Sequence, residues 1–265
     1  MLHRKITPHK VENEYLQASA YAQEQKVAAW LTELVPKMGL SCSLPTLVLS
    51  EEKKTKSFGK YPYDNIKLSL ARLENKYAQG VLSADAYCRL QAQLQAKTKE
   101  VRIVEPLLAC FEPPQKIVIY KPNLLARAKE HQLDLQQLLA EIMAHELFHA
   151  YHYNYLGAKQ WSSNSIAQAK ILTVKEALAC FSQYSYLASH NLEQQLKLFQ
   201  TKLSDSLLQA PSYPYAGARV FFDASWQPNS ELFQDVLQQS RDDWQAAYKL
   251  IIHNEKNYIS HSQIF

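Results

Sequence analysis

The chain of 265 residues is poor in glycine and lacks long apolar runs and paired cysteines. Its five glycines argue against Gly-rich phosphate loops and against a turn-dense all-β fold. No apolar run approaches the roughly 20 residues that span a bilayer, and no apolar signal segment follows the N-terminal charges. The four cysteines are far apart and form no C-x-x-C pair, which indicates free thiols, mostly buried, in a reducing compartment. We therefore expect a cytoplasmic protein with no membrane partner.

The excess of basic over acidic side chains is small. Lys and Arg total 29 and Asp and Glu total 25, and they are interleaved along the chain. The densest basic group, residues 53–56, directly follows two glutamates, so we interpret it as a solvated loop and not as a nucleic-acid patch. Hydrophobic residues make up 47% and charged residues 20%, which is typical of a globular protein. Nucleic acid is not expected as a partner.

Stretches rich in Ala, Leu, Gln, Glu and Lys predict a mainly α fold with a small β-sheet (α+β). Helices are expected over residues 11–38, 123–132, 135–156, 170–190, 192–208, 218–224 and 230–252, and a helical hairpin over residues 65–99. Short apolar runs at residues 44–50 and 116–120 predict strands. We expect one domain over residues 1–265, with a helical N-terminal part (1–100) and a core that carries the chemistry (101–265).

The sequence His145-Glu146-Leu147-Phe148-His149 has the pattern H-E-x-x-H. Asp134 is a good N-cap and Gly157 a good C-cap for the surrounding helix, so the pattern lies mid-helix. Residues four apart share one helix face, so both imidazoles can bind a single metal ion. Both histidines interrupt an apolar stripe and are expected to point inward. Zn²⁺ is the expected cofactor, with Glu146 as general base.

A catalytic zinc needs a third protein ligand. His152 lies one further turn along, and we interpret it as a polar residue that lines the cleft. Glu176 is the preferred third ligand, because the small residues Ala177 and Ala179 let two helices approach closely. The segment from Thr173 to Glu176 also fits a capping box, in which Glu176 would serve only a helix terminus. Glu193 is the fallback ligand.

These residues resemble the gluzincin type of zincin metallopeptidase, in which H-E-x-x-H is followed on a later helix by Glu and a small residue. The resemblance covers residues 145–149 and 176–179, with the strand 116–120 in the expected place before the active-site helix. It implies a zincin-like domain with added helices, and hydrolysis of a peptide or protein substrate by zinc-activated water. Members often carry an aspartate four residues after the ligand glutamate, where this chain has Cys180.

Such enzymes commonly place a further donor, after the ligand helix, to stabilise the oxyanion. Tyr213, Tyr215 and Arg219 are the candidates here, and the alternative is that the aromatic side chains only pack the turn. Two other functions stay open. One is a catalytically inactive zinc-binding protein with a regulatory or interaction role, and the other is a zinc hydrolase with a non-peptide substrate. The sequence does not determine cleavage specificity, endo- or exopeptidase action, the role of residues 65–99 or the oligomeric state.

Overall fold

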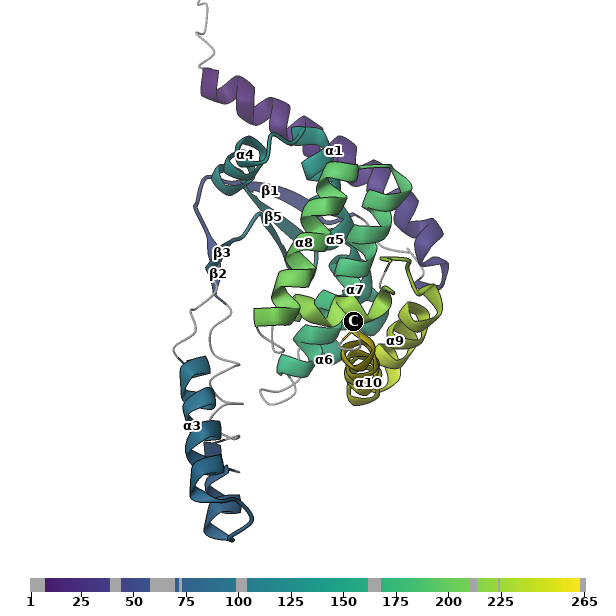
Figure 1. Cartoon of the computed structure of the whole chain (residues 1–265). Coiled ribbons are helices and arrows are strands. Elements are labelled where there is room, and N and C mark those ends of the chain that lie inside the picture. The colour runs from purple at the N-terminus through teal and green to yellow at the C-terminus, as the bar shows by residue number, and fades with distance from the viewer. Residues whose placement is uncertain are drawn as a thin grey trace, which may run out of the picture. The chain divides into compact units, whose positions relative to one another are not determined.

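The computed structural model describes residues 8–38, 44–57, 70–71, 73–98, 104–161, 168–209, 214–223 and 225–262 (Figure 1). Over these residues the fold is mainly helical with a small mixed sheet, as the sequence predicts. The chain divides into two compact units, one formed by Met1–Lys54 with Leu107–Phe265 and the other by Thr55–Pro106. This division differs from the single boundary near residue 100 that the sequence suggests. Among the described helices, none combines the length and apolar character needed to cross a membrane.

The sheet of the larger unit has three strands in the order β1-β5-β4. Strand β1 (Thr46–Ser50) pairs in parallel with β5 (Lys116–Tyr120), and Thr46 lies opposite Lys116. Both strands are confirmed predictions, although β1 begins two residues later than expected. Strand β4 (Ala109–Glu112) pairs antiparallel with β5 and forms an edge of the sheet. The sequence analysis missed β4, because Ala-Cys-Phe-Glu is short and carries little β-branched or aromatic character.

Helix α5 (Leu135–Leu156) forms the centre of the larger unit. Its N-cap is Asp134, whose side chain accepts a hydrogen bond from Gln137 N at 2.9 Å, and it ends at Gly157 with φ +78°. Both predicted caps are thereby confirmed. Helices α1 (Pro8–Leu34) and α7 (Gln168–Ser189) pack against α5. The α5–α7 approach is close, since Ser182 Oγ donates to the main-chain oxygen of Ala144 at 2.9 Å.

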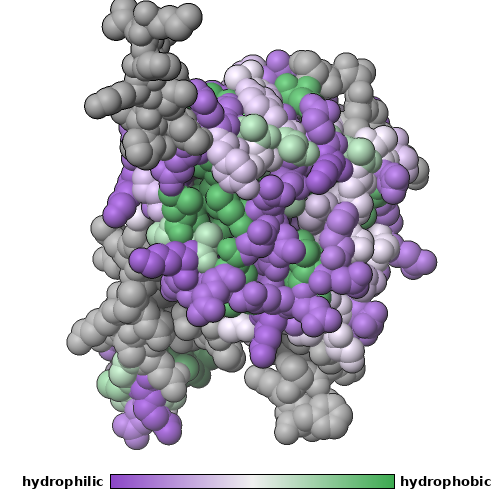
Figure 2. All heavy atoms as spheres, turned by 90° about the horizontal axis from the view of Figure 1, so that it is seen from above, coloured by the Kyte–Doolittle hydropathy of each residue, from purple (hydrophilic) through white to green (hydrophobic). Residues whose placement is uncertain are grey.

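Shorter elements complete the larger unit. They are η1 (Pro36–Met38), α4 (Lys121–Glu130), α6 (Ala158–Trp161), α8 (Glu193–Gln209), η2 (Pro214–Phe221), α9 (Ser230–Asp242) and α10 (Trp244–Ser262). The core contains side chains of α1, α5, α7, η2 and the sheet. On the face seen in Figure 2, the described residues are largely hydrophilic, with smaller apolar areas between them.

The C-terminal part corrects two predictions. The single helix expected over residues 230–252 is two helices, because Asp243 adopts an extended conformation and its Oδ1 accepts from Gln245 N at 2.7 Å. The N-cap of α9 is Asn229, whose side chain accepts from Leu232 N at 3.0 Å, and not Ser230. The helix expected over residues 218–224 is the 3-10 helix η2, and Asp223 ends it by accepting hydrogen bonds from the next turn.

The smaller unit contains the antiparallel strands β2 (Thr55–Ser57) and β3 (Val104–Pro106) and helix α3 (Ala84–Thr98). Residues 70–71 and 73–78 are also helical. Ser83 caps α3, because its Oγ accepts from Ala86 N at 3.3 Å. The rings of Tyr77 and Tyr87 stack at 4.5 Å, so the two helical stretches pack together. The predicted hairpin is confirmed for these residues, and residues 65–69, 72 and 99 lie outside the described part.

Candidate metal centre

Three polar side chains converge between α5 and α7. The Nε2 atoms of His145 and His149 lie 3.2 Å apart. Glu176 Oε2 lies 3.3 Å from His145 Nε2 and 3.8 Å from His149 Nε2. Within the described part of the chain, this is the group of His, Cys, Asp and Glu side chains that could hold a metal ion. The structure thus brings together the three ligands that the sequence suggests.

The separations of these atoms fit a tetrahedral zinc site. Ligand nitrogen and oxygen atoms lie about 2.0–2.2 Å from zinc, so two ligands of a tetrahedron lie about 3.3–3.6 Å apart. The three observed separations fall close to that range. Side-chain exposure is only 11% for His145, 10% for His149 and 6% for Glu176. Two imidazoles and a carboxylate held this close in a nearly dry site are well suited to bind a divalent cation.

The two histidines differ in their electrostatic surroundings. Burial acts to lower the pKa of both imidazoles. At His145 the thiol of Cys180 and the carboxylate of Glu176 outweigh burial and raise the pKa well above its ordinary value, whereas the pKa of His149 is lowered. Without a metal ion, the pair therefore takes up one proton between its two facing nitrogens. A divalent cation would take the place of that proton.

The alternatives for the third ligand can now be weighed. Helix α7 begins at Gln168, so Thr173 and Glu176 lie inside the helix, and a capping box is excluded. Glu193 is exposed at the start of α8 and is not part of the cluster. Cys180 is buried one helical turn after Glu176, and its thiol lies beside His145. A thiol thus occupies the place of the aspartate that the resemblance leads one to expect.

Glu146 lies next to the cluster and is buried. Its Oε2 accepts a hydrogen bond of 2.7 Å from the main-chain nitrogen of Phe111, on the edge strand β4. The strand that the sequence analysis missed is therefore the one that contacts the expected general base. Main-chain donors carry no side-chain signature, so only a correct assignment of β4 as an edge strand could have indicated this contact.

The three candidates for an oxyanion donor separate clearly. The ring centroid of Tyr215 lies 6.1 Å from that of His145, and Lys202 Nζ lies 4.7 Å from the Tyr215 ring centroid. Arg219 is buried, donates to the main-chain oxygens of Phe222 and Asp223 at 2.6 and 2.7 Å, and stacks over Trp226. These bonds assign the guanidinium to the turn after η2. Tyr213 lies outside the described residues.

Trp161 of α6 covers the site from another side. Its ring packs edge-on against His149 and Phe111, with centroids 6.1 Å away in both cases. Lys175 Nζ donates to the Trp161 main-chain oxygen at 2.8 Å and lies 3.5 Å from its ring centroid. Burial lowers the pKa of Lys175 to about 8. The sequence analysis placed Trp161 in a loop over the site, and the structure places it on a short helix in contact with a candidate ligand.

His152 does not join the cluster. It is fully buried and packs against the rings of Trp161 and Trp244. Ser240 Oγ donates to the main-chain oxygen of Leu237 at 2.7 Å, so it accepts from His152 Nε2 at 2.9 Å. Burial, together with the charges of His149 and Lys175, holds the pKa of His152 well below 6.5. It is therefore a neutral core residue and does not line a cleft.

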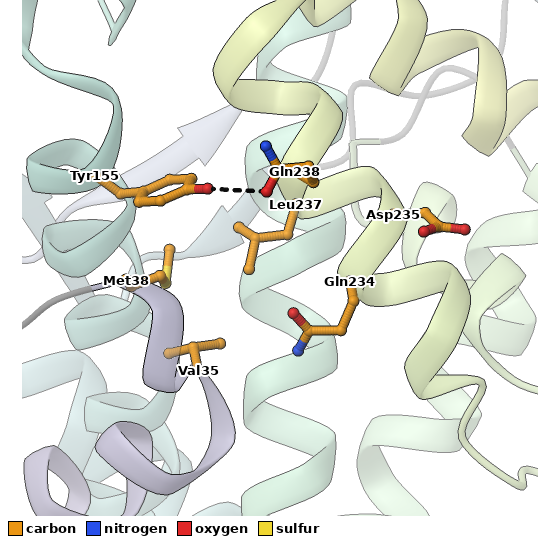
Figure 3. Close-up of a pocket in the computed structure, with 7 residues that line it drawn as sticks. All are labelled: Val35, Met38, Tyr155, Gln234, Asp235, Leu237 and Gln238. Carbon is orange, nitrogen blue, oxygen red and sulfur yellow. Dashed lines mark hydrogen bonds between the residues drawn. The ribbon is translucent and has the colours of Figure 1, made fainter.

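A separate small cavity of about 150 Å³ lies where η1, the end of α5 and α9 meet (Figure 3). Its lining includes Val35, Met38, Tyr155 and Leu237, and Tyr155 Oη donates to Gln238 Oε1 at 3.5 Å. None of the residues of the metal cluster lines it. We assign the chemistry of the protein to the cluster and not to this cavity.

Comparisons of the chain with protein-family models, with curated proteins and with solved structures found no match. The functional argument therefore rests on the geometry of the site.

Proposed function

We propose that the protein is a zinc-dependent metallopeptidase with a zincin-like domain to which helices have been added. The observation that carries the proposal is the convergence of His145 Nε2, His149 Nε2 and Glu176 Oε2 at separations of 3.2–3.8 Å, with Glu146 adjacent. Three protein ligands are the number found in catalytic zinc sites, whereas structural sites use four. The free thiols of Cys88 and Cys180 suit a reducing compartment such as the cytoplasm.

Each residue of the site then has a role. Bound zinc would supply a Lewis acid that lowers the pKa of water toward ~7 and polarises the scissile carbonyl. Glu146 takes a proton from the attacking water and passes it to the leaving amine. Tyr215, the described candidate donor nearest to His145, would donate to the oxygen that gains negative charge. Trp161 and the low exposure of the ligands keep bulk water away from the reaction.

The proposal is tested with the full-length chain, purified without added chelator. Elemental analysis should find one zinc per chain, and a mixed peptide pool should be cleaved. The Glu146→Gln variant should keep its zinc and lose at least about a hundredfold in kcat, because general-base catalysis contributes about 10²–10⁴. Glu193→Gln, which changes an exposed glutamate outside the cluster, is the matched control and should behave as wild type.

Other outcomes would each exclude something definite. A chain that binds no zinc contradicts the metal centre itself. A chain that binds zinc but cleaves no peptide contradicts the peptidase, and leaves a structural zinc or a non-peptide substrate. Equal activity of wild type and Glu146→Gln would remove Glu146 from the reaction.

A further inference from the structure

The main-chain N–H of Phe111 points away from the sheet. Strand β4 pairs with β5 so that Phe111 lies opposite Ile117 and Cys110 opposite Val118. Tyr120 N donates to Leu108 O at 2.9 Å, so the hydrogen-bonded pairs of this ladder include Leu108 with Tyr120 and, two residues on, Cys110 with Val118. Phe111 belongs to the alternate, non-hydrogen-bonded set. Its N–H is therefore directed to the outer edge of β4.

This outward N–H meets Glu146. The distance from Phe111 N to Glu146 Oε2 is 2.7 Å, and the two residues are 7% and 8% exposed. A hydrogen bond to a carboxylate is charge-assisted and about twice as strong as one between neutral groups. In a site that excludes water, no solvent molecule competes for the carboxylate oxygen. The bond thus joins α5 to the edge strand at the residue that is to move protons.

We propose that the main-chain amide of Phe111 is a positioning group for the catalytic base Glu146. It holds Oε2 at the edge of β4 and so leaves Oε1 to take the proton from water and return it to the leaving amine. The amide keeps its own proton throughout. The catalytic role rests on the proposed function, whereas the holding of the carboxylate does not.

The side chain of Phe111 fixes the donor in place. Its ring packs edge-on against Tyr153 and Trp161, with centroids 5.9 and 6.1 Å away, and Trp161 in turn packs against His149. Edge-to-face aromatic pairs contribute beyond the apolar area they bury. The ring therefore anchors β4 beside α5, and the N–H contacts the base. Substitutions can separate these two contributions.

The kinetic test compares two variants of the zinc-loaded, full-length protein. Phe111→Ala removes the ring and keeps the N–H, whereas Phe111→Pro removes both. Proline is tolerated on an edge strand where its nitrogen makes no ladder bond. Relative to Phe111→Ala, kcat of Phe111→Pro on a peptide should fall at least about tenfold, with KM within about twofold and zinc content unchanged. Equal kcat values for the two variants would overturn the positioning role.

A second measurement needs neither activity nor a folded proline variant. In wild type, the Phe111 amide should be protected from hydrogen exchange by Glu146. In Glu146→Ala its exchange should be at least about tenfold faster, since a hydrogen bond to a charged group is lost. The amide of Ala109, two residues away on the same edge, should not change. If the Phe111 rate is unaltered, the inference is wrong; if it rises while wild type cleaves no peptide, only the proposed function fails.

Discussion

At the residue scale, the site depends on atoms that have little reason to be together without a cation. Burial removes water from His149 and Glu176, and their polar atoms face one another across 3.8 Å. Water-excluded polar groups destabilise a fold unless they are paired or bind a metal. The ligand-binding energy of the site is therefore also part of the stability of the protein.

Removal of zinc should lower the stability of wild type. With free zinc at about 100 times its dissociation constant, binding stabilises the folded chain by about 2.7 kcal/mol, and a chelator abolishes that contribution. Thermal unfolding should therefore show a lower Tm in excess chelator. In Glu176→Gln, which weakens the site, the chelator should change Tm much less. An identical shift in both proteins would show that the chelator acts elsewhere.

Glu24 of α1 predicts a pH-dependent stability. It is 1% exposed, its Oε1 has no hydrogen-bond partner among the described residues, and burial raises its pKa to about 7. A carboxyl whose folded pKa is raised stabilises fully below its unfolded pKa near 4.5, and loses that contribution as pH rises through 7.

The Glu24→Gln variant should therefore be more stable than wild type at pH 8, by about 1–3 kcal/mol, and close to it at pH 4.5. Denaturant unfolding at both pH values measures the difference. Glu33→Gln, an exposed position on the same helix, should show no such pH-dependent gain. A constant difference for Glu24→Gln at both pH values would mean that the carboxyl does not titrate as inferred.

At the scale of elements, the approach of η2 to α7 sets the position of Tyr215. Gly217 of η2 lies against the turn of α7 that precedes and includes Glu176. A Cβ at this position would lie 2.9 Å from Thr173 Cγ2 and 3.5 Å from Ala177 Cβ. Glycine is needed here because the two elements are in close approach.

Gly217→Ala should thus move η2 away from α7. Overpacking of this kind costs about 1–3 kcal/mol, so the free energy of unfolding should fall, and peptidase activity should fall with it as Tyr215 shifts. Zinc content should stay the same, because all three ligands lie on α5 and α7. The double variant Thr173→Ser with Gly217→Ala removes the opposing methyl group and should recover most of the stability. Failure to recover would place the strain elsewhere.

The elements also show what a sequence can predict. Helix α5 was predictable because Asp134 and Gly157 cap a long apolar stripe, and the metal cluster followed from two histidines one turn apart. The break at Asp243 was missed because the residues on both sides have helical character, and a side-chain cap decides between one helix and two. The contact from Phe111 to Glu146 was missed because it depends on strand register and a main-chain donor.

At the scale of the whole molecule, the smaller unit is inserted into the larger one. The chain leaves the larger unit at Lys54 and returns at Leu107, and Leu107 N donates to Lys54 O at 2.9 Å. Asn123 Nδ2 donates to both of these main-chain oxygens, at 2.5 and 2.8 Å. The two ends of the insertion are therefore held together by the larger unit itself.

Replacement of residues 55–106 by a short Gly-Ser linker should therefore leave the larger unit folded, because its internal contacts do not need a long connection. The shortened chain should bind one zinc and unfold cooperatively, with a Tm within a few degrees of wild type. Zinc analysis and thermal unfolding check this. Loss of both properties would show that the smaller unit is required for the fold, whereas loss of activity alone would indicate a role toward substrate.

The parallel pairing of β1 with β5 has a consequence for biosynthesis. Thr46 cannot meet Lys116 until the whole insertion has been translated. At about 5–20 residues per second, roughly 4–14 seconds pass between synthesis of the two partners. During that interval the apolar residues of α1 and β1 emerge from the ribosome with nothing to cover them. The nascent chain therefore has a period in which chaperones can bind it, ended by the arrival of β5.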